Sequence, residues 1–548
     1  MKLLSHPAGK ITSRKVEWQL PPVLPLHGSI KERSAALVES LNSPIGPMLR
    51  QLLAKWIADQ AVPAARLVPK RFENWLPVVR DAMCFVVLNL SADRLAPKII
   101  QQLDLPPRTR IETRLLLLIA KVPGLQKLGQ IVARNRHLGR ALRRSLVKLE
   151  NGIRDVEAGE VQRLIRRQLG QKLEDLQVRM RPTLLSEASV SAIVRFTWKQ
   201  PGSAVRRAGV FKVLKPYIPS YFKEDLQLLQ GLTEHFGSRL DQYGFAADAL
   251  ADTFGKVRRL LAHEVDFWGE QRTLSAAAKV YASTPNVRVP HVIAELCTDS
   301  ITAITEEKGA KVTDCGRLLS RSEKKELARR VIDAFVIVPL FSPDEQILFH
   351  ADPHAGNILY DRATRKLVIL DWALTESLNR SQRRNLGLLL FYFALRDPLG
   401  TTRCVLALAS PKRSSCSRKD VLELVSGYLE DMKLSHLPSS VDAMRLLEWL
   451  TAKGVRFPSP LIMLSKVLFT LDGVLHDLGV DDLSIGNVVC RHLLARSVRS
   501  RHLSLWPLRS KDLIYLHASA LLYPARMWIG IERATLKWLV KENVQSSV

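Results

Sequence analysis

Cysteines are few in this sequence of 548 residues. Only six cysteines occur, none forms a Cys-x-x-Cys pair, and none is spaced with histidines as in a zinc site. This usage indicates free thiols in a reducing compartment rather than a disulfide or zinc framework. The six positions are Cys84, Cys297, Cys315, Cys404, Cys416 and Cys490.

Long apolar runs are equally scarce. No stretch of about 18 uninterrupted apolar residues, the length that spans a bilayer as a helix, occurs in the sequence. The segment from Met1 to Lys15 has no long apolar run, so it predicts no secretory signal and favours a transit peptide only weakly. We therefore expect a cytoplasmic protein that associates peripherally with a membrane. The longest apolar candidates, all too short to span, are Leu115–Ala120, Ala334–Phe341 and Leu513–Ala525.

Acidic residues are outnumbered. The 81 basic and 53 acidic residues give a formal net charge of +28, which attracts polyanions such as nucleic acid, anionic lipid headgroups or nucleotide phosphates. Few aromatic residues accompany the basic runs, which argues against a single-stranded nucleic acid partner. The densest run is either a solvated helix face or a contact for anionic lipid or phosphate. It comprises Arg134, Arg136, Arg140, Arg143, Arg144 and Lys148.

The order of helix-like and strand-like segments divides the chain into five parts. Two β-branched runs, Val190–Lys199 and Arg207–Leu214, flank the turn residues Gln200–Ser203 and predict an antiparallel hairpin. A long helical region is expected from Lys223 to Ala282, and short strands from 347 to 371. The predicted parts are a helical extension (1–105), a basic helical segment (106–175), a lobe with the hairpin (176–309), a second lobe (310–430) and a second helical extension (431–548).

One loop carries the strongest pattern of polar residues. His350 and Asp352 form His-x-Asp, Asn357 follows five residues after the aspartate, and Asp371 follows fourteen residues later on an apolar strand. This order matches the His-Arg-Asp, Asn and Asp-Phe-Gly series of protein kinases. Mg²⁺ prefers oxygen ligands, which Asn357 and Asp371 can supply, and Asp352 is the candidate base or nucleophile-orienting group. Alone, the stretch from Asp352 to Asn357 is also an ordinary turn, but the placement of Asp371 favours the metal-site interpretation.

The upstream hairpin supplies a candidate phosphate-binding lysine. Lys212 lies on the second strand between apolar residues, like the Val-Ala-Ile-Lys lysine of kinases that contacts the α- and β-phosphates. A lone lysine on a strand is usually only solvated, so a helix partner is needed, and Glu270 is the predicted ion-pair partner. With Asp352, these two residues make up the predicted catalytic set. The predicted fold is α+β, a bilobal protein-kinase-like fold with N-terminal and C-terminal helical extensions.

Together these residues resemble the UbiB (AarF-like) family of atypical kinase-like proteins, from about Val122 to Ala373. The Lys-x-Gly-Gln motif of that family is matched by Lys127 and Gln130, three residues apart on one helical face. The resemblance implies that this helix covers the site where a kinase receives a protein substrate. It also implies that Glu264 and Asp266, which match the family's Glu-x-Asp motif, meet that helix near the metal and the phosphates.

The family's alanine-rich nucleotide loop corresponds to residues 186–191. Its small residues Ala188, Ser189 and Ser191 suit a close approach of backbone to phosphate, whereas Glu187 adds an unfavourable charge beside it. The loop has fewer alanines than the family usually shows, and the Asp-Phe-Gly motif is changed to Asp-Trp-Ala. All the proposed polar ligands are present, so the resemblance still implies an active protein.

The resemblance implies a protein that binds ATP and Mg²⁺ as an ATPase or small-molecule kinase. It would support isoprenoid-quinone (ubiquinone) or other lipid metabolism at an anionic membrane surface, and a lipid-biosynthesis complex is a compatible partner. Two alternatives stay open: a phosphotransferase acting on a protein or metabolite hydroxyl, and a non-catalytic nucleotide-binding scaffold. Nucleic-acid binding rests on charge alone and is not expected.

Overall fold

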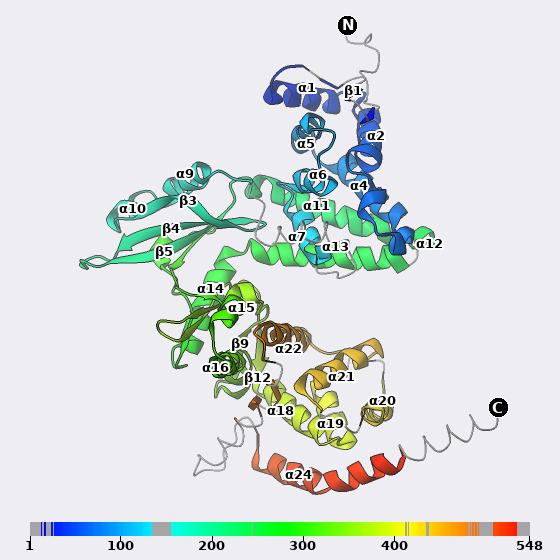
Figure 1. The fold of residues 1–548 in the computed structure, drawn as a ribbon, viewed down its shortest axis with the longest axis vertical. Coiled ribbons are helices and arrows are strands. Elements are labelled where there is room, and N and C mark those ends of the chain that lie inside the picture. Colours follow the sequence, from blue (N-terminus) through cyan, green and yellow to red (C-terminus); the bar gives the residue numbers. More distant parts are fainter. Residues whose placement is uncertain are drawn as a thin grey trace, which may run out of the picture. The chain divides into compact units, whose positions relative to one another are not determined.

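The fold is described by a computed structural model, shown in Figure 1. It describes residues 12–13, 16–17, 24–25, 27–133, 155–243, 245–410, 414, 416–433, 438–480, 483, 485–486, 488–489, 492 and 508–533. The basic run from Arg134 to Lys148 lies outside these residues. The chain forms two compact units, one made of residues 1–268 and 293–305, the other of residues 269–292 and 306–548. The finer five-part division stays a prediction.

Helices fill the N-terminal part of the first unit, as expected. The first of them starts with a capping box, because the Ser29 hydroxyl accepts from the Glu32 N–H and the Glu32 carboxylate accepts from the Ser29 N–H. The Pro106–Pro107 pair separates α5 from α6. The elements are β1 (Thr12–Ser13), β2 (Val16–Glu17), α1 (Ile30–Asn42), α2 (Gly46–Trp56), η1 (Ile57–Ala61), α3 (Ala64–Leu67), η2 (Lys70–Trp75), α4 (Leu76–Asn89), α5 (Ala92–Asp104), α6 (Ile111–Ile119) and α7 (Pro123–Ala133).

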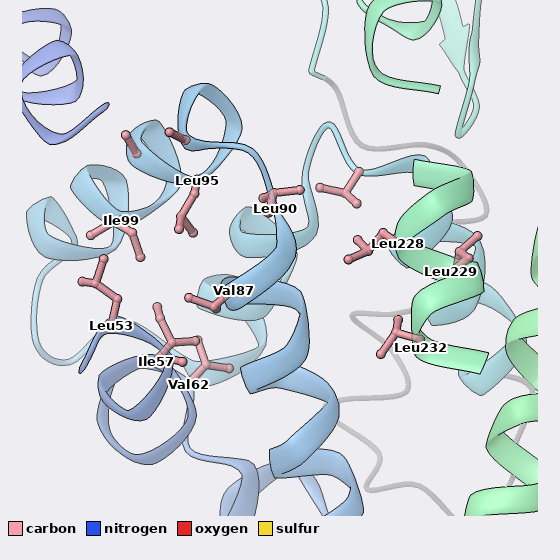
Figure 2. Close-up of a cluster of buried hydrophobic side chains, with 14 of the residues drawn as sticks. Leu53, Ile57, Val62, Val87, Leu90, Leu95, Ile99, Leu228, Leu229 and Leu232 are labelled. Carbon is pink, nitrogen blue, oxygen red and sulfur yellow. The ribbon is translucent and has the colours of Figure 1, made fainter. Parts of the chain in front are cut away.

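The N-terminal helices share one hydrophobic core with later parts of the first unit. Leucine, isoleucine and valine side chains from α2, α4 and α5 meet one another, and the same cluster continues to the leucines of α11 (Ile218–Gly237), as Figure 2 shows. Burial of such side chains is the main favourable contribution to folding. The N-terminal extension is therefore packed into the unit that carries the hairpin. Labelled members of the cluster are Leu53, Ile57, Val62, Val87, Leu90, Leu95, Ile99, Leu228, Leu229 and Leu232.

The predicted hairpin forms the centre of a four-stranded antiparallel sheet. The strand order is β3-β4-β5-β7, and Lys212 on β5 pairs with Ile193 on one side and Thr302 on the other. Phe196 and Phe211 stack on its inner face with ring centroids 3.9 Å apart. The hairpin prediction is confirmed. The strands are β3 (Arg179–Glu187), β4 (Ser191–Lys199), β5 (Arg206–Leu214) and β7 (Ile301–Thr305).

In the first unit, helices precede β3 and lie between β5 and β7. The helical region expected from Lys223 to Ala282 is present, but it is divided into separate helices, with one break at Val265–Asp266 between α13 and α14. That break separates Glu264, the last residue of α13, from Glu270 on α14. The elements are α9 (Ala158–Leu169), α10 (Gln171–Asp175), α12 (Leu240–Tyr243), α13 (Phe245–Glu264), α14 (Phe267–Tyr281), which begins in the first unit and continues into the second, and η4 (Ala294–Leu296).

The described residues of the second unit form two small sheets. One has the order β6-β11-β10-β8, and the other pairs β9 with β12 in antiparallel register. The β9–β12 pair and the β10–β11 hairpin bracket the loop that carries Asp352 and Asn357. Short strands were expected in this part of the chain, and they are confirmed. The strands are β6 (Val287–Arg288), β8 (Ala310–Lys311), β9 (Gln346–His350), β10 (Ile358–Asp361), β11 (Lys366–Ile369) and β12 (Thr375–Asn379).

Most of the other described residues of the second unit are helical. Capping boxes start α16, α18, α20 and α21, and each satisfies N–H groups that a helix leaves unpaired at its first turn. Small sheets with many helices confirm the α+β class. The helices are α15 (Val312–Cys315), η5 (Gly316–Leu318), α16 (Arg321–Ile332), η6 (Asp333–Ile337), α17 (Val338–Phe341), η7 (Ala355–Asn357), α18 (Arg380–Ala394), α19 (Pro398–Leu408), α20 (Arg418–Asp431), α21 (Ser440–Ala452), α22 (Ser459–Asp477) and α24 (Ser510–Leu521).

Among the described residues, α22 alone has the length and composition of a membrane span. Its apolar window has a mean hydropathy of 1.2, and 44% of that window is buried within the protein. Leu464, Leu468 and Leu471 lie in the core, and Lys466 on the same helix bonds to Asp352. A core helix of a soluble protein passes the same test of length and hydropathy, and these contacts assign α22 to the core of the second unit.

Candidate functional site

The predicted site residues fall on both units. The first unit carries the residues expected to hold phosphate: Lys127, Gln130, Ala188, Ser189, Ser191, Lys212, Glu264 and Asp266. The second unit carries the residues expected to hold metal or to act on the nucleophile, together with Glu270: Asp352, Asn357 and Asp371.

The predicted nucleotide loop is the tight turn between β3 and β4. The Ala188 N–H donates to the Ser191 carbonyl at 2.8 Å, which closes the turn around Ser189 and Val190. Ser191 is the first residue of β4 and is 1% exposed. The turn is therefore built from small residues on a rigid strand pair, which is the local geometry that a phosphate-binding loop needs.

Glu264 brings two other predicted residues together. One carboxylate oxygen forms an ion pair with the Lys127 ammonium of α7, and the other accepts a hydrogen bond from the Ser189 hydroxyl at 2.6 Å. Gln130 lies three residues beyond Lys127 on α7, and Asp266 follows Glu264 in the break before α14. The Lys-x-Gly-Gln helix, the Glu-x-Asp segment and the nucleotide turn thus meet at one point of the first unit.

Lys212 has an apolar setting. Its neighbours Phe211 and Val213 are fully buried, and its ammonium nitrogen lies 5.7 Å from the ring centroid of Phe267, a cation–π distance. Glu270 is 7% exposed on α14. Because Lys212 and Glu270 belong to different units, their predicted ion pair stays a prediction.

Glu187 has a cationic partner within the protein. This carboxylate was expected to be unfavourable beside a phosphate, and that effect stays a prediction. Glu187 is 7% exposed, its Oε2 lies 3.2 Å from the Lys215 ammonium, and it accepts a hydrogen bond from the Asp155 N–H at 3.2 Å. Glu187 and Asp155 therefore share the Lys215 ammonium.

In the second unit, His350 connects the two segments that carry the predicted acidic residues. Its Nδ1 accepts from the Asp352 N–H at 3.1 Å, and its Nε2 lies 3.0 Å from the carbonyl of Leu370, the residue before Asp371. The ring is 1% exposed and packs edge-on against Trp372 at 5.0 Å. Burial lowers the pKa of His350, so the imidazole is neutral with its proton on Nε2.

Asn357 and Asp371, the predicted metal ligands, have side chains with defined local contacts. The Asn357 side-chain amide donates to the Asp352 carbonyl at 3.3 Å, which orients its Oδ1, and no described residue donates to that oxygen. Asp371 has φ of 55°, an uncommon left-handed backbone, and its Oδ1 accepts from the Ala373 N–H at 3.4 Å. Trp372 anchors this bend, because its indole N–H donates to the Ile369 carbonyl and its own carbonyl accepts from Thr273.

This donor set fits Mg²⁺. No group of three or more His, Cys, Asp or Glu side chains gathers around a metal position in the described part of the chain. Mg²⁺ does not need such a cage, because it keeps several waters and binds one or two protein oxygens plus substrate phosphates. One amide oxygen and one carboxylate on a braced loop meet that requirement.

Two polar residues next to the predicted ones were not predicted from the sequence. Lys466 on α22 lies 3.4 Å from Asp352 Oδ1, and Asp155 donates its N–H to Glu187. Neither belongs to a local motif, and only contacts across long stretches of sequence reveal them. The role of His350 was also missed, although its place in His-x-Asp was the available signal.

Comparison with known proteins gives one domain match and many distant relatives. Residues 148–404 match the ABC1 atypical kinase-like domain. An uncharacterized protein in the hydrogenase 1 5′ region of Clostridium pasteurianum is 22% identical over 386 residues, which cover 68% of this chain and 69% of that protein. A probable protein kinase UbiB of Pseudomonas fluorescens (strain SBW25) is 24% identical over 411 residues, covering 72% and 74%.

One solved structure, the complex of Rv3197 with erythromycin from Mycobacterium tuberculosis, aligns with a TM-score of 0.43 and 17% identity, over 67% of this chain and 89% of that one.

The domain match and the arrangement of the catalytic-loop residues define an atypical kinase-like protein with helical extensions. More particularly, the chain is similar to proteins of the UbiB/ABC1 family.

Proposed function

We propose that this protein binds ATP with Mg²⁺ and either hydrolyses it or transfers its γ-phosphate to a small molecule. The activity would support isoprenoid-quinone or other lipid metabolism at a membrane surface. The observation that carries the proposal is the position of His350. By bonding both to the Asp352 N–H and to the Leu370 carbonyl, it braces the catalytic-loop aspartate and the segment before Asp371 as one framework.

Each residue then has a defined task in phosphoryl transfer. Asn357 and Asp371 would hold Mg²⁺, which supplies charge neutralisation at the phosphate oxygens. Asp352 would orient the attacking hydroxyl or water, and Lys212 would bind phosphate oxygens. The turn at Ala188 and Ser189 would present backbone N–H groups to phosphate. Catalysis of this kind depends on positioning and electrostatics, which suits a rigid, braced loop.

The membrane part of the proposal rests on the helical residues 510–533. Polar side chains attach this segment to the second unit: Asp512 pairs with Arg384, and Ser519 donates to Asp397 at 2.7 Å. The opposite face is apolar and exposed, which reverses the usual pattern of a surface helix. The large exposed side chains of this segment recur every seven residues, which places them on one face of the helix. They are Ile514, Leu521 and Trp528, at 69%, 81% and 65% exposure.

The test is Mg²⁺-dependent ATP binding and phosphate release by the purified full chain, with and without vesicles containing anionic phospholipid. Asp371→Asn should abolish turnover, whereas the exposed Asp472→Asn on α22 should leave it intact. Turnover that rises with anionic vesicles but not with neutral ones supports the membrane part. A chain that does not bind ATP with Mg²⁺ overturns the proposal. Labelled phosphate that appears on an acceptor faster than in solution identifies a phosphotransferase instead.

A further inference from the structure

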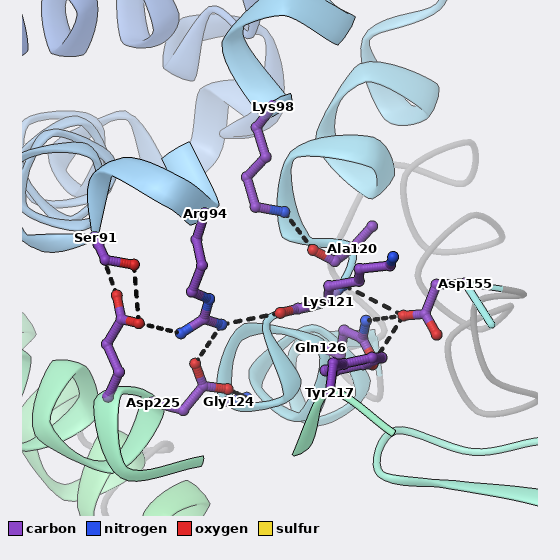
Figure 3. A network of polar contacts seen from close by, with 11 residues as sticks. Ser91, Arg94, Lys98, Ala120, Lys121, Gly124, Gln126, Asp155, Tyr217 and Asp225 are labelled. Atoms are coloured by element: carbon purple, nitrogen blue, oxygen red, sulfur yellow. Dashed lines mark hydrogen bonds and ion pairs between the residues drawn. The ribbon is translucent and has the colours of Figure 1, made fainter. Parts of the chain in front are cut away.

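Asp155 is a buried meeting point of segments that are distant in sequence. Its Oδ1 lies 2.7 Å from the Lys215 ammonium, and its backbone N–H donates to Glu187. Its Oδ2 accepts from the Tyr217 hydroxyl at 3.0 Å, and from the Gln126 side-chain amide and the Lys121 N–H at 3.3 Å each. Figure 3 shows Asp155 with its partners Lys121, Gln126 and Tyr217.

One side of this cluster contacts the predicted nucleotide turn. Glu187 is the last residue of β3, directly before Ala188. Lys215 bonds to Glu187 with its side chain, and its backbone N–H donates to the Val190 carbonyl at 2.9 Å. Lys215 therefore holds both ends of the turn, and Asp155 holds Lys215.

The other side of the cluster contacts residues at the start of α7. Lys121 and Gln126 flank the start of that helix, and Gln126 is the residue immediately before Lys127. Gln126 is 1% exposed, so its amide has no solvent to replace the bond to Asp155. Through these two donors, the same carboxylate that serves the turn also fixes the helix with the Lys-x-Gly-Gln motif.

We infer that Asp155 is a positioning residue that locks α7 and the nucleotide turn in one arrangement, so that Lys127 and the turn backbone face the same phosphates. The inference rests on the proposed nucleotide binding. It adds Asp155 and Lys215, which lie outside the recognised motifs, and gives Glu187 of the predicted loop a part in positioning.

The charges of the cluster decide which substitutions are informative. The side chains of Asp155, Glu187 and Lys215 are 4%, 3% and 0% exposed. Neutralising either carboxylate leaves one ammonium paired with one carboxylate. Lys215→Met would leave both carboxylates buried without that cation, which is strongly destabilising and therefore uninformative. Asp155→Asn and Glu187→Gln are the useful variants, because both keep the volume of the side chain.

The first measurement is hydrogen–deuterium exchange of the nucleotide-free protein. Asp155→Asn places an amide nitrogen among groups that donate, so it should speed exchange in both 124–130 and 186–191. Glu187→Gln should speed exchange in 186–191 alone. Asp442→Asn, which removes a buried capping aspartate on α21, should affect neither segment. Unchanged exchange of 124–130 in Asp155→Asn overturns the inference.

The second measurement is affinity for Mg-ATP. Asp155→Asn should weaken binding by roughly tenfold with a smaller change in turnover at saturation, because a shift in positioning alters ligand contacts first. The affinity of Asp442→Asn for Mg-ATP should stay within about twofold of the wild type, even if this variant lowers Tm as much as Asp155→Asn does. Equal weakening by both variants would show a merely structural role and overturn the inference. If the wild type does not bind ATP, the proposed function fails, whereas the exchange result still decides whether Asp155 couples the two segments.

Discussion

The ammonium nitrogen of Lys466 lies 3.4 Å from Oδ1 of Asp352, although the two residues are 114 positions apart. Lys466 sits on α22, so a core helix of the second unit presents a cation to the catalytic-loop carboxylate. Their side chains are 41% and 28% exposed, which means that water screens the pair. An exposed ion pair of this kind is worth at most about 1 kcal/mol.

That limit sets the expected effect of Lys466→Met. Turnover of ATP should fall by about two- to fivefold, with little change in Tm, because the lysine only helps to orient Asp352. Lys466→Arg should restore most of the loss. Asp352→Asn, by contrast, should lower turnover by about a hundredfold or more. Steady-state phosphate release measures all three, and Lys419→Met on α20 serves as the control. A loss in Lys466→Met as large as that in Asp352→Asn would give the lysine a direct part in the chemistry.

His350 should make stability depend on pH. Burial lowers its pKa below the ordinary value of 6.5, so the unfolded chain takes up a proton at mildly acidic pH while the folded chain does not. This group's contribution to stability is therefore complete above about pH 6.5 and is lost as the pH falls towards the folded-state pKa. His350→Gln cannot be protonated, so the Tm of the wild type should fall more steeply than that of the variant between about pH 7.5 and pH 5.5.

The control for this prediction is His517→Gln, which changes an exposed histidine of the same unit. Its Tm should follow the wild-type curve. Parallel curves for the wild type and His350→Gln would mean that His350 is not held neutral in the folded protein.

Local patterns in the sequence were sufficient to predict much of the fold. They also located the parts of the candidate site on the β4–β5 hairpin and on the loop from His350 to Asp371. The β4–β5 hairpin was predicted because β-branched residues flank a Pro-Gly turn, and both the pattern and the pairing are local. The loop from His350 to Asp371 was found for the same reason. The meeting of Lys127 with Glu264, 137 residues apart, was expected only from the family resemblance.

Other features depend on contacts that no local pattern encodes. The strand β3 was not predicted. It contains Pro182, and a proline is tolerated there because β3 is at the edge of its sheet, where a missing N–H breaks no ladder bond. The charge of Glu187 was judged by its neighbours in sequence, whereas its partner Lys215 lies 28 positions away and becomes adjacent only through the β4–β5 hairpin.

Lys98 should make the stability of the protein rise with pH. It lies among the polar contacts of Figure 3, where it donates to the Ala120 carbonyl. Burial, followed by the like charge of Arg94, lowers its pKa from 10.5 to about 7. Between these values the unfolded chain holds a proton that the folded chain has released, so stability rises with pH. At or below about pH 7 the folded protein must bury the charge.

Lys98→Met tests this directly. Relative to the variant, the wild type should gain about 1 kcal/mol of unfolding free energy per pH unit between about pH 7.5 and pH 9.5. Urea unfolding at several pH values measures the difference, in which the titration of other groups cancels. Lys31→Met, an exposed change on α1, should give a difference that does not vary with pH. A pH-independent difference for Lys98→Met would show that Lys98 stays charged in the folded protein.

The exposed face of residues 510–533 should decide binding to membranes. Leu521 and Trp528 are 81% and 65% exposed, so replacing either with aspartate should leave Tm within about 1 °C of the wild type. Burying such a side chain in the bilayer interface contributes roughly 1.5–3 kcal/mol, so each change should weaken binding to anionic vesicles by at least about tenfold in co-sedimentation. Leu318→Asp, 67% exposed elsewhere in the same unit, is the matched control and should bind as the wild type does. Equal loss in all three variants would assign the effect to added negative charge rather than to this helix face.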